Sequence, residues 1–144
     1  MCAYIEVYMS LQDKLEKMFS ETIVKEAMTR AIVSVDPSTK LTQISKMMEQ
    51  GGMGSILVKR NGFPAGIITD RDFAIKVAAL GISLNTPVEK IATFPLITIP
   101  FDKSLLDAAK IMSERKIRKL AVVEEEKIVG IITTTDLVNK LVLT

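Results

Sequence analysis

The chain alternates short apolar runs with longer segments in which apolar residues recur every three or four positions. Short apolar runs bounded by glycine, proline or polar residues predict β-strands. We expect such strands at residues 32–35, 55–58, 65–69, 96–99, 120–123 and 128–133. The longer segments predict amphipathic helices. Their expected buried faces are Leu41, Ile44, Met47 and Met48 in one helix and Leu105, Ala108, Ile111 and Met112 in another.

One stretch of this pattern is present twice. Gly66–Asp72 reads GIITDRD and Gly130–Asp136 reads GIITTTD. The same offset in numbering relates Val24 to Val88, Leu41 to Leu105, Met48 to Met112 and Lys76 to Lys140. A register that holds over this length without a gap predicts a tandem duplication, so that one structural unit is expected to be built twice.

Each repeat predicts the order β-α-β-β-α, which follows a short helical turn at Val24–Thr29 in the first repeat. Asn61–Gly62 predicts a tight hairpin between two strands, and Glu124–Glu126 predicts a polar turn at the matched place. Ser38 and Asp102 precede the two amphipathic helices at matched positions. Because both side chains can accept a hydrogen bond from a helix start, we expect them to act as N-caps.

A three-stranded sheet with helices on it leaves apolar surface, which a second copy of the unit can cover. We therefore expect an α/β (α+β) fold with two repeats, residues 22–80 and 86–143, packed about a pseudo-twofold axis. Residues 1–21 lie outside the duplication and predict an amphipathic helix. Ser10–Asp13 resembles a capping box at the start of that helix. Its apolar face, which we expect to pack on the repeats or on a second chain, contains Leu11, Leu15, Met18 and Phe19.

Composition narrows the function classes. A hydrophobic fraction of 48% with 25% charged residues is typical of a globular protein, and the apolar runs are too short to span a bilayer. The single cysteine excludes an intrachain disulfide and, with no visible signal peptide, predicts a cytoplasmic location. A net charge of +2 argues against nucleic-acid binding, and the absence of histidine removes the usual residues of metal sites and catalytic triads. We therefore expect no enzyme, no catalytic residue and no metal site.

Thr69 with Asp72, and Thr133 with Asp136, begin the last helix of each repeat. In one interpretation each pair is a capping box that stabilises its helix by about 1 kcal/mol and needs no ligand. In the other, the free N–H groups and positive dipole of the helix start bind a phosphate, and the carboxylate accepts both hydroxyls of a ribose. The same atoms are able to serve both roles.

The Val-x-x-x-Met-Thr of Val24–Thr29 and the Gly-Ile-Ile-Thr-x-x-Asp of both repeats resemble the cystathionine β-synthase (CBS) domain family. The resemblance covers roughly residues 22–143 and is that of two CBS domains paired in a Bateman module. Ala92 departs from it, since the family commonly has methionine there. The resemblance implies a regulatory module that reversibly binds AMP, ADP or ATP in clefts between the repeats and acts on a partner protein. No obligatory cofactor is implied.

The resemblance also assigns roles to other residues. Basic side chains at Arg118 and Lys119 are expected to meet nucleotide phosphates, although cations near a helix end are otherwise explained by solvation. Ser55 matches Lys119 in the first repeat and offers only a hydroxyl. Ile32 and Leu96 are expected to bracket an adenine, and core packing explains them equally well.

Arg71 is expected to reach a phosphate or to pair with Asp70. The predicted nucleotide-binding residues are Thr133, Asp136, Arg118, Lys119, Leu96, Thr69, Asp72, Arg71, Ser55 and Ile32. Because the motif that ends in Asp136 contains no second carboxylate, we expect the site at Asp136 to bind first and more tightly. A homodimer is also expected. The alternatives are a ligand-free dimerisation or docking module, a sensor of S-adenosylmethionine, and a weak phosphotransfer enzyme that uses the carboxylates.

Overall fold

The computed structural model describes the backbone of residues 2–142 and the side chains of residues 10–142. The chain forms two compact units. Unit 1 consists of the described residues of Met1–Ala31 and Ile97–Thr144, and unit 2 is Ile32–Leu96. Each unit therefore combines most of one repeat with the segment that leads into the other repeat.

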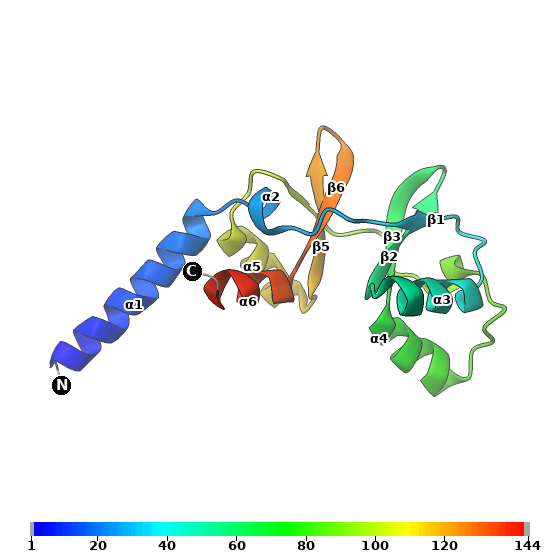
Figure 1. Cartoon of the computed structure of the whole chain (residues 1–144), viewed down its shortest axis with the longest axis horizontal. Coiled ribbons are helices and arrows are strands. Elements are labelled where there is room, and N and C mark those ends of the chain that lie inside the picture. The colour runs from blue at the N-terminus through cyan, green and yellow to red at the C-terminus, as the bar shows by residue number, and fades with distance from the viewer. Residues whose placement is uncertain (1, 143–144) are drawn as a thin grey trace. The chain divides into compact units, whose positions relative to one another are not determined.

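Unit 2 contains one three-stranded sheet with helices beside it (Figure 1). Its elements are β1 (Ser34–Val35), α3 (Leu41–Gly51), β2 (Ser55–Arg60), β3 (Phe63–Thr69), α4 (Asp70–Asp72), the π-helix η1 (Phe73–Ala78) and the 3₁₀-helix η2 (Val88–Lys90). Strand β2 lies in the middle, parallel to β1 and antiparallel to β3. Asn61 and Gly62 have φ angles of 55° and 82°, as the predicted tight hairpin between β2 and β3 requires.

Unit 1 repeats this plan and adds a long helix. Its elements are α1 (Cys2–Glu21), α2 (Val24–Ala27), β4 (Thr98–Pro100), α5 (Leu105–Arg115), β5 (Lys119–Glu124), β6 (Lys127–Thr133) and α6 (Thr134–Val142). The strand order is β4-β5-β6, again with a parallel and an antiparallel pair. The mixed α/β fold and its duplicated plan are therefore as predicted.

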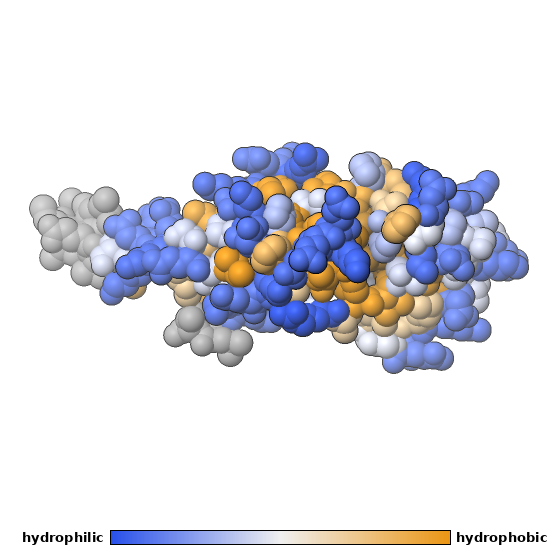
Figure 2. All heavy atoms as spheres, turned by 90° about the horizontal axis from the view of Figure 1, so that it is seen from above, coloured by the Kyte–Doolittle hydropathy of each residue, from blue (hydrophilic) through white to orange (hydrophobic). Residues whose placement is uncertain are grey.

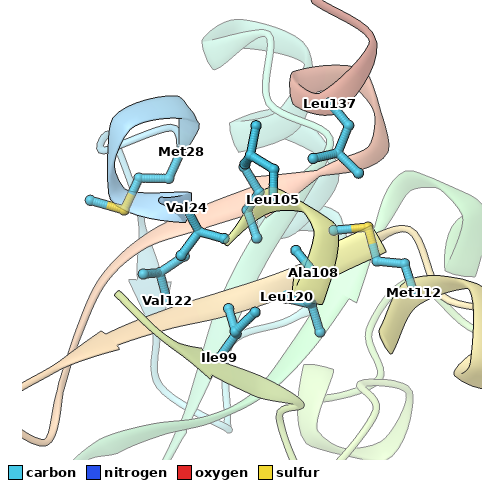
Figure 3. Packing of buried hydrophobic residues seen from close by; sticks show 10 residues of the cluster. Val24, Met28, Ile99, Leu105, Ala108, Met112, Leu120, Val122 and Leu137 are labelled. Carbon is cyan, nitrogen blue, oxygen red and sulfur yellow. The ribbon is translucent and has the colours of Figure 1, made fainter. Parts of the chain in front are cut away.

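Each unit has its own apolar core. In unit 1, Leu105 and Ala108 of α5 are fully buried against sheet residues such as Leu120 and Val122 (Figure 3). In unit 2, Leu41 and Ile44 of α3 are fully buried. The predicted helix faces are thus confirmed, with Met47, Met48 and Ile111 packed at the edges of the two cores.

The leading segments of the two repeats, Val24–Thr29 and Val88–Thr93, complete the sheets of the units that they join. Thr29 and Ile131 of unit 1 exchange two backbone hydrogen bonds of 2.9 Å, which adds Thr29 to the free edge of β6. Thr93 does the same for Ile67 on β3, with bonds of 2.9 and 3.0 Å. The matched segments Val24–Thr29 and Val88–Thr93 therefore have matched places in the two units.

These contacts explain the glycine of the repeated motif. A Cβ atom on Gly130 would lie 2.5 Å from Sδ of Met28 and 2.7 Å from the carbonyl oxygen of Thr29. On Gly66 it would lie 2.6 Å from the ring of Phe94. Phe94 therefore covers Gly66 in unit 2 as Met28 covers Gly130 in unit 1, and alanine at position 92 is compatible with the same plan.

The predicted N-caps are wrong by two residues. The N-caps are Lys40 for α3 and Ser104 for α5, rather than Ser38 and Asp102. Ser104 forms a reciprocal capping box with Asp107, with bonds of 3.0 and 3.2 Å. Lys40 makes no side-chain cap. Instead, the backbone carbonyl of Thr86 accepts from the N–H of Leu41 at 3.1 Å. A residue far away in the sequence therefore satisfies an N–H group at the start of the helix.

Several element boundaries also differ from the predictions. Helix α1 begins at Cys2 and runs through the predicted start at Ser10, because no residue there breaks the helix. Strands β1 and β4 begin two residues later than predicted, so Ile32 and Leu96 lie before them. The N–H of Leu96 donates to the carbonyl of Ala65 in unit 2, at 2.8 Å, and is therefore engaged outside the ladder of β4 and β5.

Candidate functional site

The junction of the last strand and last helix brings the predicted polar residues of each unit together. We call these junctions the Asp72 corner, made of Ser55 and Thr69–Asp72, and the Asp136 corner, made of Arg118, Lys119 and Thr133–Asp136. They form because the sheet pairs the start of one strand with the end of the next. Ser55 is the register partner of Thr69, and Lys119 is that of Thr133.

Both corners contain the predicted capping box. At the Asp136 corner, the backbone N–H and the hydroxyl of Thr133 donate to Oδ2 of Asp136 at 2.9 and 3.0 Å. The N–H of Asp136 donates back to Oγ1 of Thr133 at 3.1 Å. The corresponding distances between Thr69 and Asp72 are 2.8, 3.1 and 3.4 Å. The carboxylate of each box is thus held at the start of a helix and is only half-buried.

The box uses the two carboxylate oxygens unequally. Its hydrogen bonds go to Oδ2 of Asp72 and of Asp136, so Oδ1 stands outside the box in both corners. At Asp72, Oδ1 forms an ion pair with Nζ of Lys76 at 3.2 Å. That ammonium also donates to the carbonyl of Ile91 at 3.1 Å. Lys76 therefore ties the Asp72 corner to the leading segment that completes the sheet.

The predicted phosphate ligands are distributed unequally between the corners. Arg118 is exposed and Lys119 is half-buried, and the carbonyl of Arg118 accepts from the N–H of Thr134 at 3.0 Å. Their backbone therefore lies beside the start of α6. At the Asp72 corner, Gly54 and Ser55 occupy the matched places.

Arg71 and its neighbour Asp70 are both exposed. The backbone N–H of Arg71 donates to Oδ1 of Asp70 at 2.8 Å, whereas the side chain forms no ion pair with any described residue. The predicted pairing of the guanidinium with Asp70 is therefore absent within the described part. The guanidinium remains available at the rim of the corner.

The two apolar residues predicted to bracket an adenine, Ile32 and Leu96, are both half-buried and both belong to unit 2. Ile32 is the first residue of unit 2 and Leu96 is its last. In the sequence, Leu96 belongs to the second repeat, whose corner lies in unit 1. The structure thus places Ile32 and Leu96 with the unit of the Asp72 corner and does not bring Leu96 into the unit of the Asp136 corner.

Lys76 is a residue whose part in the corner the sequence reasoning missed. Two signals were present: its spacing of four residues from Asp72 on a helix, and its match to Lys140 in the other repeat. Its ion pair with Asp72 partly neutralises the carboxylate predicted to bind a ribose. Lys76 therefore belongs with Thr69 and Asp72 in any account of that corner.

Unit 2 also has a shallow depression of about 510 Å³ between the end of α3 and the start of α4. Its lining is Ser45, Met48, Glu49, Gly52, Met53, Gly54, Asp70 and Phe73. It contains none of the predicted ligands, and its two carboxylates would repel a phosphate. The corners therefore remain the better candidates. No helix within residues 2–142 is both long and apolar enough to cross a membrane, and no cluster of potential metal ligands is found among the described residues.

Comparisons with known proteins bear on the whole duplicated region. The model of the CBS domain family matches residues 24–79 and 88–143. The CBS domain-containing protein YhcV of Bacillus subtilis is 34% identical over 114 residues, which cover 79% of this chain and 81% of that protein. The crystal structure of an uncharacterized conserved protein from Pyrococcus horikoshii is 32% identical, with a TM-score of 0.79 over 85% of this chain and 93% of that one.

A further structure shows the same fold at lower identity. It is the CBS domain pair of protein MJ0100, in complex with 5′-methylthioadenosine and S-adenosyl-L-methionine. Its identity to this chain is 24% and its TM-score is 0.74, over 83% of this chain and 95% of that one.

Proposed function

The chain belongs to the CBS domain family, and we propose that it is a regulatory module that reversibly binds an adenine nucleotide and acts on a partner protein. The observation that carries this proposal is the capping box of both corners, which holds a carboxylate at a helix start with one oxygen outside the box. No covalent step is part of the proposed function. The single cysteine fits a reducing compartment, which for this module we take to be the cytoplasm.

Each group of a nucleotide has a counterpart in this arrangement. Ribose hydroxyls would donate to Oδ1 of Asp136, and the charge of the acceptor makes such bonds stronger than those between neutral groups. Phosphates would be attracted by the helix start and by Arg118 and Lys119. Thr133 would have the double role of N-cap and wall of the site. The protein MJ0100 supports the proposal at the level of fold, since a CBS domain pair is there in complex with adenosine compounds.

A melting screen with AMP, ADP, ATP and S-adenosylmethionine tests the proposed function. A ligand at 100 times its dissociation constant stabilises the folded state by about 2.7 kcal/mol, which raises the melting temperature by several degrees. We expect at least one adenine nucleotide to do so, with guanosine monophosphate as the control for the base. A melting temperature that none of these ligands changes would contradict the proposal and favour a ligand-free docking module.

We also propose that the chain forms a homodimer. Apolar side chains remain exposed on helices of both units, among them Val138 and Leu141 of α6 and Ile75 of η1, with 55%, 42% and 51% of their surface accessible. Light scattering at micromolar concentration is expected to give twice the mass of the chain. The mass of a single chain at this concentration would reject the homodimer.

A further inference from the structure

The helix α1 stands clear of the rest of unit 1 over most of its length. Figure 1 shows it extending away from the sheet, with its C-terminal end beside α5. That end is anchored: Phe19 packs against the core of unit 1, and Thr22 just beyond the helix is buried. By contrast, every residue from 10 to 17 is exposed. Unit 1 therefore leaves the described side chains of this stretch uncovered.

The exposed stretch is amphipathic. Leu11 and Leu15 have 55% and 50% of their surface accessible, and Met18 follows on the same side of the helix, half-buried. Most of the coloured surface of α1 in Figure 2 is hydrophilic. The spacing of four and then three residues is that of a coiled-coil seam, and in the sequence it continues upstream at Tyr4 and Tyr8. Such a narrow apolar stripe fits the stripe of another helix.

The charges of α1 indicate which partner helix fits its apolar stripe. Residues 2–21 contain two lysines and four acidic residues, a net charge of −2 that disfavours an anionic membrane surface. Lys14 and Glu21 lie seven positions apart, and each flanks the stripe on the same side. If two copies of α1 pair antiparallel with Leu15 of each against Met18 of the other, Lys14 of each lies beside Glu21 of the other. A parallel pair would instead place Lys14 beside Phe19.

We propose that α1 is a homotypic docking helix, which pairs antiparallel with α1 of a second copy of this chain through Leu11, Leu15 and Met18. Two symmetric pairs between Lys14 and Glu21 select this orientation. Neither side chain forms an ion pair with the described residues of its own chain, so both are available for these pairs. The inference rests on the proposed homodimer and names the surface that forms it. The segment lies outside both matches of the CBS domain family.

Disulfide trapping in the full-length chain tests the pairing. In a Cys2→Ser background, one variant has Lys14→Cys and a second, with a size tag, has Glu21→Cys. We expect mild oxidation of the mixture to give mainly the mixed disulfide, with at least tenfold less of either symmetric product. Adding Leu11→Glu and Leu15→Glu to both variants is expected to reduce the mixed product at least tenfold. Adding Ser10→Glu and Ser20→Glu, which introduce equal charge off the stripe, is expected to leave it unchanged.

Charge reversal gives an independent readout. Lys14→Glu is expected to weaken dimerisation in sedimentation experiments, and the double variant Lys14→Glu/Glu21→Lys is expected to restore it. A wild-type chain that is monomeric would overturn the homodimer itself. A wild-type dimer without the mixed disulfide, or one that persists with Leu11→Glu and Leu15→Glu, would overturn only the role of α1 and would assign the interface to another surface such as α6.

Discussion

Replacing Gly130 by alanine is expected to lower the free energy of unfolding by about 1–3 kcal/mol, the usual range for overpacking a core. The new Cβ atom would lie 2.5 Å from Sδ of Met28 and 2.7 Å from the carbonyl oxygen of Thr29. Met28 is buried, and Thr29 is held in place by its two hydrogen bonds to Ile131. The carbonyl of Thr29 cannot move away without breaking the edge of the sheet, and Met28 can move only by repacking the core. The leading segment and the core of unit 1 would therefore lose stability together.

Urea unfolding of Gly130→Ala measures this effect, and two other glycines provide graded controls. At Gly66 the three atoms nearest to the new Cβ all belong to the ring of Phe94, a side chain, so we expect a smaller loss of stability. Alanine at Gly51 would meet chiefly the end of the Met53 side chain, and alanine favours a helix over glycine by roughly 0.5–1 kcal/mol. We therefore expect Gly51→Ala to be neutral or stabilising. Equal losses at all three positions would show that the close backbone contact of Gly130 does not matter.

The sequence predicted the elements because their signals are local. Short apolar runs predicted the strands, the turns between them predicted both hairpins, and the three-to-four spacing predicted the buried faces of α3 and α5. The residue pair Thr133 and Asp136 predicted its own capping box, since both partners lie within one turn. Each of these features is decided by residues close together in the chain, and the signals for strands, hairpins and helices are present in both repeats.

Part of what the sequence did not predict depends on distant partners. The start of α3 is satisfied by the carbonyl of Thr86, so no capping side chain marks it and Ser38 was a misleading signal. The leading segment of the first repeat joins unit 1 through the backbone pairing of Thr29 with Ile131. Such pairing uses backbone groups that every residue type has, so the sequence does not reveal it. Lys76 was visible as a neighbour of Asp72 on the helix, but its bond to the carbonyl of Ile91 was not.

Changing Asp136 to asparagine is expected to weaken the tighter nucleotide site by roughly ten- to a hundredfold. A hydrogen bond to a charged acceptor contributes about 1.5–3 kcal/mol, and asparagine removes the charge while it keeps an oxygen for the N–H of Thr133. Calorimetry measures the affinity. Asp107→Asn is the matched control, because Asp107 forms the same capping box at the start of α5, where no ligand is predicted. We expect the control to bind nucleotide like the wild type.

The same experiment decides between the two corners. At the Asp72 corner, the exposed Asp70 opposes a phosphate. The Asp136 corner has no second carboxylate in its motif and adjoins Arg118 and Lys119. Two unit charges 4 Å apart interact by ~4 kcal/mol at an effective dielectric constant of 20, and a fraction of this separates the affinities by tenfold.

We therefore expect Asp136→Asn to weaken the tighter site and Asp72→Asn to weaken only the other one. Because the difference is electrostatic, the advantage of the Asp136 corner is expected to grow from AMP to ATP and to shrink as salt is added. Loss of the tighter site in Asp72→Asn, with Asp136→Asn unchanged, would contradict the assignment of Arg118 and Lys119 to the Asp136 corner. Unchanged affinity in both variants and in the double variant would remove the ribose role from the two carboxylates and leave them as helix caps.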